Sequence, residues 1–204
     1  MAQSIVKAAR AYLAAATEIE RAGLRPELEA FKGDFDEIVQ ALRPQPTAPV
    51  ETGWLLSQPF RSPRLAGRYP EQPITLFVPP DYDPATAHGL LIWLHGGGQG
   101  GGDIGKHQHE HNPWLNSEVE ECGRVVCYPS APPSQRSWAR WQLPEADQYL
   151  ADVIEELEHA YNLDPDNVIL GGHSMGGMGA YHMAHRFADR FSTILASAGH
   201  WDFG

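Results

Sequence analysis

Hydrophobic and polar positions follow two different spacings along this chain of 204 residues. In residues 1–43 the apolar side chains recur at steps of three and four, which predicts amphipathic helices. We expect one helix before Gly23 and a second after Pro26, because these two residues interrupt the pattern. The two apolar faces comprise Ile5, Ala9, Tyr12, Leu13, Ala16 and Ile19 in the first helix and Leu28, Phe31, Phe35, Ile38, Val39 and Leu42 in the second.

Short apolar runs alternate with helical patterns after a proline-rich linker at residues 44–50. Such alternation predicts an α/β domain over residues 51–204, with a mostly parallel sheet and helices on both faces. We expect strands at 74–78, 90–94, 124–128, 167–170 and 192–197, and helices at 113–122, 144–161 and 177–187.

The composition of the chain narrows the classes of partner that it is expected to bind. Fifteen Lys and Arg stand against 26 Asp and Glu, a formal net charge of −11 that disfavours nucleic acid and anionic membranes. No run approaches the roughly 20 apolar residues that span a bilayer. Charges at Lys7, Arg10, Glu18 and Glu20 interrupt the N-terminal apolar positions, so we predict no signal peptide and expect a cytoplasmic protein.

A serine lies in the turn between a predicted strand and a predicted helix. Gly172-His173-Ser174-Met175-Gly176 matches G-x-S-x-G, and the motif needs this strand-to-helix context. A sharp turn there exposes the serine hydroxyl, provided that the residues two before and two after are small. We therefore predict that Ser174 is a nucleophile.

A glycine run follows the strand predicted at residues 90–94. Backbone N–H groups without side chains can approach an oxyanion closely, and acyl transfer needs at least two such donors. We expect the Gly96–Gly98 loop to supply one donor, from Gly97 or Gly98, and the N–H of Met175 to supply the other. His95 is expected to anchor this loop by hydrogen bonding.

Together, His95-Gly-Gly-Gly98 and Gly172-His-Ser-Met-Gly-Gly177, with the flanking Asp166-Asn-Val-Ile-Leu170, resemble the α/β-hydrolase family. The resemblance covers about residues 72–200 and is closest to the phospholipase/carboxylesterase, feruloyl-esterase and polyhydroxyalkanoate-depolymerase groups. It implies hydrolysis of a small-molecule carboxylic ester through an acyl-enzyme on Ser174, with no metal and no organic cofactor.

The base and the acid that activate such a serine are the open part of this prediction. In the family the acid and the histidine follow later strands, so we expect an α/β-hydrolase domain that is truncated and incomplete at its C-terminus. His200 and Asp202, in the tail after the last predicted strand, are the candidate base and acid within the chain.

Several alternatives remain open at this stage. One alternative is that the chain is a catalytically incomplete hydrolase-like binding protein. Another is a metal-dependent hydrolase that uses His107, His109 and His111 in an extended segment. Trp138 and Trp141, with Trp114 as a further candidate, either line an aromatic or acyl pocket or pack beneath a long loop. The N-terminal helices either dock on the α/β domain, form a lid or mediate a homodimer.

Overall fold

The computed structural model describes residues 2–42, 46, 50–97, 102–133 and 140–200. The chain divides into two compact units, residues 1–44 and residues 45–204. Within the described residues, no helix combines the length and apolarity that crossing a bilayer requires.

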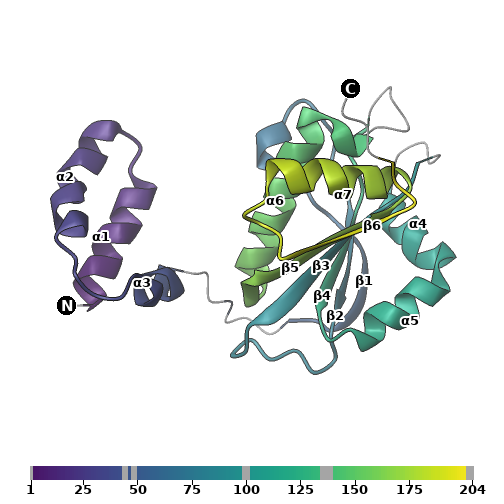
Figure 1. Ribbon diagram of the computed structural model, residues 1–204, viewed down its shortest axis with the longest axis horizontal. Helices are drawn as coiled ribbons and strands as arrows, with labels where there is room; N and C mark the ends of the chain where they lie inside the picture. Colours follow the sequence, from purple (N-terminus) through teal and green to yellow (C-terminus); the bar gives the residue numbers. More distant parts are fainter. Residues whose placement is uncertain (1, 43–45, 47–49, 98–101, 134–139, 201–204) are drawn as a thin grey trace. The chain divides into compact units, whose positions relative to one another are not determined.

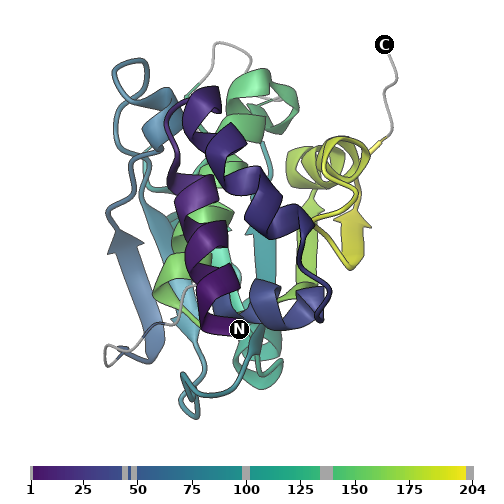
Figure 2. The ribbon, with the colours of Figure 1, turned by 90° about the vertical axis from the view of Figure 1, so that its left-hand side faces the viewer.

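The N-terminal unit consists of three helices, α1 (Ala2–Ala14), α2 (Glu18–Glu29) and α3 (Phe35–Leu42). Figure 2 shows α1 and α2 side by side, and the unit has its own apolar cluster around Ile5, Ala9 and Ile38. The predicted break at Gly23 and Pro26 is wrong, because both residues lie inside α2. The second helix instead begins at Glu18, after the N-cap residue Thr17, whose hydroxyl accepts from Glu20 N–H while the Glu20 carboxylate accepts from Thr17 N–H.

The second unit is built on a six-stranded sheet in the order β1-β2-β4-β3-β5-β6. β2 pairs antiparallel with both of its neighbours, β1 and β4. The pairs β4–β3, β3–β5 and β5–β6 are parallel. The expected mostly parallel sheet is therefore confirmed. The strands are β1 (Gly53–Gln58), β2 (Ile74–Val78), β3 (His88–Leu94), β4 (Val125–Pro129), β5 (Leu163–His173) and β6 (Thr193–Ser197).

Helices cover both faces of this sheet (Figure 1). One face carries α4 (Ile104–His111) and α5 (Pro113–Glu121), and the other carries α6 (Pro144–Ala160) and α7 (Met175–Arg186). Two short 3₁₀ helices, η1 (Pro63–Leu65) and η2 (Arg140–Gln142), contact α6. The sequence predicted neither β1 nor α4.

Alternating side chains of the central strands fill two cores. Leu90, Ile92 and Leu94 belong to the larger cluster, which includes residues of α6 and α7, and Leu91 belongs to the smaller one with residues of α5. β3 and β5 pair over Leu90–Leu94, so the ends of these two strands are fixed next to each other. The loops that follow them, which carry both predicted motifs, therefore lie together.

Candidate active site

Ser174 occupies a sharp turn between β5 and α7. Its backbone has φ 56° and ψ −117°, a conformation that non-glycine residues seldom adopt, and the residue is exposed. The backbone N–H of Ser174 donates to Ser197 O of β6 at 2.8 Å, and its carbonyl accepts from Met178 N–H at 3.0 Å. The turn is thus held from both sides while the side chain stays accessible.

The glycines around Ser174 permit a close crossing of backbones. A Cβ at Gly172 would lie 2.5 Å from the carbonyl carbon and oxygen of Gly176. A Cβ at Gly176 would lie 2.0 Å from the carbonyl oxygen of Leu94, at the end of β3. Neither position has room for a side chain, which is the physical reason for both glycines of the motif.

The loop after β3 approaches the serine directly. A Cβ at Gly96 would be 3.7 Å from Ser174 Cβ and 3.5 Å from His173 O, so the loop backbone borders the nucleophile. Gly97 is exposed next to it, and Gly98 lies outside the described residues. Met175 is the first residue of α7, and the first N–H groups of a helix have no intrahelical acceptor.

His95 fixes the base of this loop. Its Nδ1 lies 2.7 Å from Gly96 O, and its Nε2 lies 3.1 Å from Ala131 N. Because Ala131 N–H must donate, Nε2 accepts and Nδ1 carries the proton that it donates to Gly96 O. Burial lowers the pKa of His95 to about 4, so the ring is neutral near pH 7 and serves as an anchor.

The predicted base and acid are only partly placed. His200 is exposed, three residues beyond the end of β6, at the edge of the sheet where Ser174 also lies. No hydrogen bond joins it to Ser174 among the described residues, and Asp202 lies outside them. The ring of His173 turns to Ser197, with Nδ1 3.3 Å from its hydroxyl oxygen.

Trp141 packs beneath the loop, which is the second of its two interpretations. It is fully buried, and its indole N–H donates to His95 O at 3.0 Å. Gly179 of α7 leaves room for it, since a Cβ there would lie 2.3 Å from Trp141 Cβ. Trp141 therefore supports the loop from below. Trp138 lies outside the described residues.

The histidine tract is helical, which corrects the expected extended segment. His107, His109 and His111 lie on α4, where residues two apart point in different directions. The rings of His107 and His111 lie 3.9 Å apart, whereas His109 packs against Trp54 of β1 at 4.3 Å. Among the described residues, no three His, Cys, Asp or Glu side chains form a group that could hold a metal ion.

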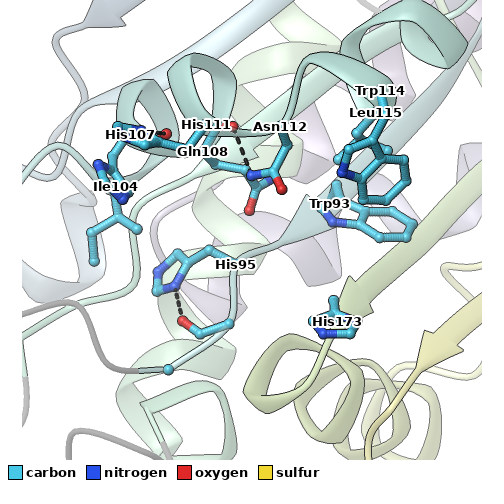
Figure 3. A pocket seen from close by; sticks show the side chains of 12 residues that line it. Trp93, His95, Ile104, His107, Gln108, His111, Asn112, Trp114, Leu115 and His173 are labelled. Atoms are coloured by element: carbon cyan, nitrogen blue, oxygen red, sulfur yellow. Dashed lines mark hydrogen bonds between the residues drawn. The ribbon is translucent and has the colours of Figure 1, made fainter.

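A pocket of about 350 Å³ opens beside the loop, and we call it the rim pocket (Figure 3). The sequence indicated only Trp114 as a wall of such a pocket, because the other walls come from the ends of β3 and β5, from α5 and from the unpredicted helix α4. Strand-end residues and helical residues face each other across it. It is lined by Trp93, His95, Gly96, Gly97, Ile104, His107, Gln108, His111, Asn112, Trp114, Leu115 and His173.

Known proteins similar to this chain include several esterases. A bifunctional acetylxylan esterase/xylanase (XynS20E) of Neocallimastix patriciarum is 29% identical over 131 residues, which cover 64% of this chain and 18% of that protein. An ethyl acetate hydrolase of Pseudomonas putida is 31% identical over 121 residues, 57% of this chain and 35% of that protein. The chain thus spans about a third or less of the length of these two curated relatives.

Solved structures share the fold. A thermostable esterase matches with a TM-score of 0.59 and 24% identity, over 72% of this chain and 41% of its own. An S-formylglutathione hydrolase of Staphylococcus aureus matches with a TM-score of 0.58 and 19% identity, over 76% of this chain and 62% of its own. A family model described as alpha/beta hydrolase fold matches residues 91–198, which contain both glycine motifs and more than half of the chain. The chain belongs to the alpha/beta hydrolase fold family.

Proposed function

We propose that this protein hydrolyses small-molecule carboxylic esters through an acyl-enzyme on Ser174. One observation carries the proposal: Ser174 is exposed at φ 56° next to the glycine loop at the neighbouring strand end. Its Cβ lies 3.7 Å from the position that a Cβ on Gly96 would occupy. That is the arrangement a tetrahedral intermediate needs, with a nucleophile on one side and backbone donors on the other. The esterase names of the two curated relatives support the same reaction class.

The reaction then follows from these positions. Ser174 Oγ attacks the ester carbonyl carbon and loses its proton to a histidine, while the carbonyl oxygen becomes an oxyanion facing Met175 N–H and the Gly96–Gly98 loop. The bond to the alcohol oxygen breaks, and the histidine returns the proton to that oxygen. A water molecule, activated by the same histidine, releases the acid and restores Ser174. These steps require no metal or organic cofactor.

His200 is our candidate for the histidine, with Asp202 as the acid that orients it. His200 follows β6, whose Ser197 carbonyl already accepts from Ser174 N–H, so both residues belong to one corner of the sheet. The cytoplasmic location expected from the charged N-terminal helix remains a prediction beside this proposal, which cell fractionation tests.

The test is the reactivity of Ser174. We expect the chain to react with a fluorophosphonate and to hydrolyse para-nitrophenyl acetate, and Ser174→Ala to lower the rate about a thousandfold or more and to abolish labelling. His200→Ala should lower the rate about a hundredfold or more. Ser117→Ala, an exposed serine on α5, is the control and should change nothing. Labelling that persists in Ser174→Ala would refute the nucleophile, and an unlabelled wild-type chain would favour a hydrolase-like binding protein.

A further inference from the structure

The rim pocket contains a buried polar group with no partner. Gln108 of α4 is only 7% exposed, and its side-chain Nε2 has no hydrogen-bond partner among the residues that the structure describes. A buried amide N–H without an acceptor is less stable than one that is paired. Since Gln108 lines the pocket, an oxygen atom of a ligand seated there can supply the missing acceptor.

The opposite end of the pocket is flat and apolar. Trp93, Trp114 and Leu115 line that end, as Figure 3 shows. Trp114 is 64% exposed although it is a large apolar side chain, so much of its surface is available to a ligand. The pocket therefore offers a surface for a planar apolar group and, across it, a donor for an oxygen atom.

The place of the pocket relative to Ser174 indicates which part of an ester it receives. In the sheet, β5 lies between β3 and β6. The rim pocket lies on the β3 side, against Gly96 and Gly97, whereas His200 follows β6. Because the histidine must return a proton to the leaving alcohol, the alcohol faces the β6 side. The acyl group then extends toward the pocket.

We propose that the rim pocket binds the acyl group of the substrate, and that Gln108 selects acyl groups with a planar body and a hydrogen-bond-accepting oxygen at the far end. Gln108 and Trp114 are specificity-determining residues in this assignment, and neither takes part in bond making or breaking. The inference rests on the proposed function for the orientation of the ester, but the binding site itself exists without turnover.

Binding of two stable acyl analogues tests the assignment without requiring catalysis. Para-acetylbenzamide and para-isopropenylbenzamide have nearly the same shape, and only the first carries an acceptor oxygen at its far end. By calorimetry we expect saturable binding of both to the wild-type chain, with the acetyl compound about fivefold to tenfold tighter. Gln108→Leu should abolish this preference by weakening only the acetyl compound, and Trp114→Ala should weaken both about fivefold or more.

Gln148→Leu is the matched control, because Gln148 is exposed on α6, remote in the fold from the pocket helix α4. It should leave both dissociation constants unchanged. Equal binding of the two compounds to the wild-type chain, no saturable binding, or a preference that survives Gln108→Leu would each overturn the assignment. Because Trp114 is exposed, Trp114→Ala gives a folded second variant if Gln108→Leu is unstable.

The outcome is separable from that of the proposed function. Fluorophosphonate labelling of Ser174 reports the nucleophile whether or not the amides bind, and the amides report the pocket whether or not Ser174 is reactive. If both hold, para-acetylbenzamide should also slow the labelling of Ser174 in the wild-type chain and do so about fivefold to tenfold less effectively in Gln108→Leu. Unchanged labelling at saturating amide would contradict the assignment of the acyl group to this pocket.

Discussion

The exposed position of Ser174 depends on close backbone crossings that glycine alone permits. The turn places the chain after β5 against the end of β3, where a Cβ at Gly176 would meet the Leu94 carbonyl. Gly96 differs, because a Cβ there would make only ordinary contacts, at 3.5 Å or more. Two glycines of the same site should therefore respond differently to the same substitution.

We expect Gly176→Ala to lower the free energy of unfolding by about 2–3 kcal/mol and to abolish labelling of Ser174, because the backbone must shift to admit the methyl group. Gly96→Ala should change the unfolding free energy by no more than about 0.5 kcal/mol, while its methyl group, close to Ser174, slows labelling. Urea denaturation measures the first quantity and fluorophosphonate kinetics the second. A fully stable Gly176→Ala would refute the packing argument.

His95 links the stability of the site to pH. Its pKa is about 4 in the folded chain because burial disfavours the charged ring, against an ordinary value near 6.5. Below pH 6.5 the unfolded chain therefore binds more protons at this position than the folded chain does. Stability must fall as pH falls from about 6.5 to about 4, and the contribution becomes constant below that window.

At about 1.4 kcal/mol per proton and pH unit, the contribution of His95 should fall by about 2 kcal/mol between pH 7 and pH 5. We expect His95→Asn to be less stable than the wild-type chain at pH 7, because two hydrogen bonds are disturbed, but to lose about 2 kcal/mol less on going to pH 5. Urea denaturation of both proteins at the two pH values gives the comparison. Parallel losses would show that His95 titrates normally.

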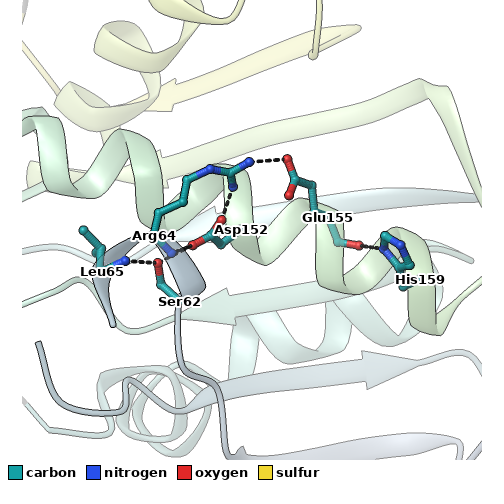
Figure 4. Close-up of polar contacts among 6 residues, drawn as sticks. All are labelled: Ser62, Arg64, Leu65, Asp152, Glu155 and His159. Carbon is teal, nitrogen blue, oxygen red and sulfur yellow. Dashed lines mark hydrogen bonds and ion pairs between the residues drawn. The ribbon is translucent and has the colours of Figure 1, made fainter. Parts of the chain in front are cut away.

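At the scale of elements, a buried carboxylate joins the segment after β1 to α6 (Figure 4). Asp152 of α6 is 4% exposed and accepts from Ser62 Oγ, from Arg64 N at 3.0 Å and from the Arg64 guanidinium. The same guanidinium reaches Glu155, one turn along, at 2.7 Å, but that pair is partly exposed. The two carboxylates thus bind one arginine in different environments.

Asp152→Asn should lower the free energy of unfolding by about 2 kcal/mol, because charge-assisted hydrogen bonds to a buried group are weakened. Glu155→Gln, the matched control one turn along α6, should cost at most about 0.5 kcal/mol, since solvent screens an exposed pair. Thermal or urea unfolding measures both variants. Equal losses of unfolding free energy in the two variants would contradict the prediction that the burial of Asp152 makes its contacts the stronger ones.

The elements that sequence reasoning found and missed differ in how local their signals are. Ser174, the flanking glycines and the loop after β3 were predicted because each motif is contiguous and follows a strongly apolar strand. The start of α2 has a local signal, the Thr17 and Glu20 capping box, and the helix continues through Pro26. β1 had a weaker signal, since Ser57 at φ 56° interrupts its alternation and, within the described part of the chain, the strand pairs with β2 alone.

Other features depend on contacts between distant segments and had no local signal. α4 begins where the Ser130 hydroxyl accepts from Ile104 N–H and Gly105 N–H, 3.0 and 3.1 Å away. Gly105, a poor helix former, is needed there because a Cβ would lie 2.2 Å from Tyr128 O. The burial of Trp141 likewise depends on the absent side chain of Gly179, which lies 38 residues later in the sequence.

At the scale of the whole molecule, the two units have separate cores. The apolar cluster of residues 1–44 contains members of α1 and α3, and the clusters of residues 45–204 contain members of the sheet and its helices. Several large apolar side chains lie on the surface of the N-terminal unit, namely Leu13, Ile19, Phe35 and Val39. Exposed apolar side chains of this kind favour association, so of the three roles that the sequence left open for these helices we predict the homodimer.

Removal of residues 1–44 tests both statements at once. We expect light scattering to give the mass of two copies for the full chain and of one copy for residues 45–204, because the apolar surface that favours association is then gone. The unfolding free energy of the sheet unit should stay within about 1 kcal/mol of its value in the full chain, since its core is its own.

The charge variant Leu13→Glu/Phe35→Glu should give single copies without any deletion, because burying two unpaired carboxylates in the contact costs far more than exposing them. If the full chain is a single copy at every concentration, the N-terminal helices have another role, and docking on the sheet unit would then appear as a loss of its stability on deletion.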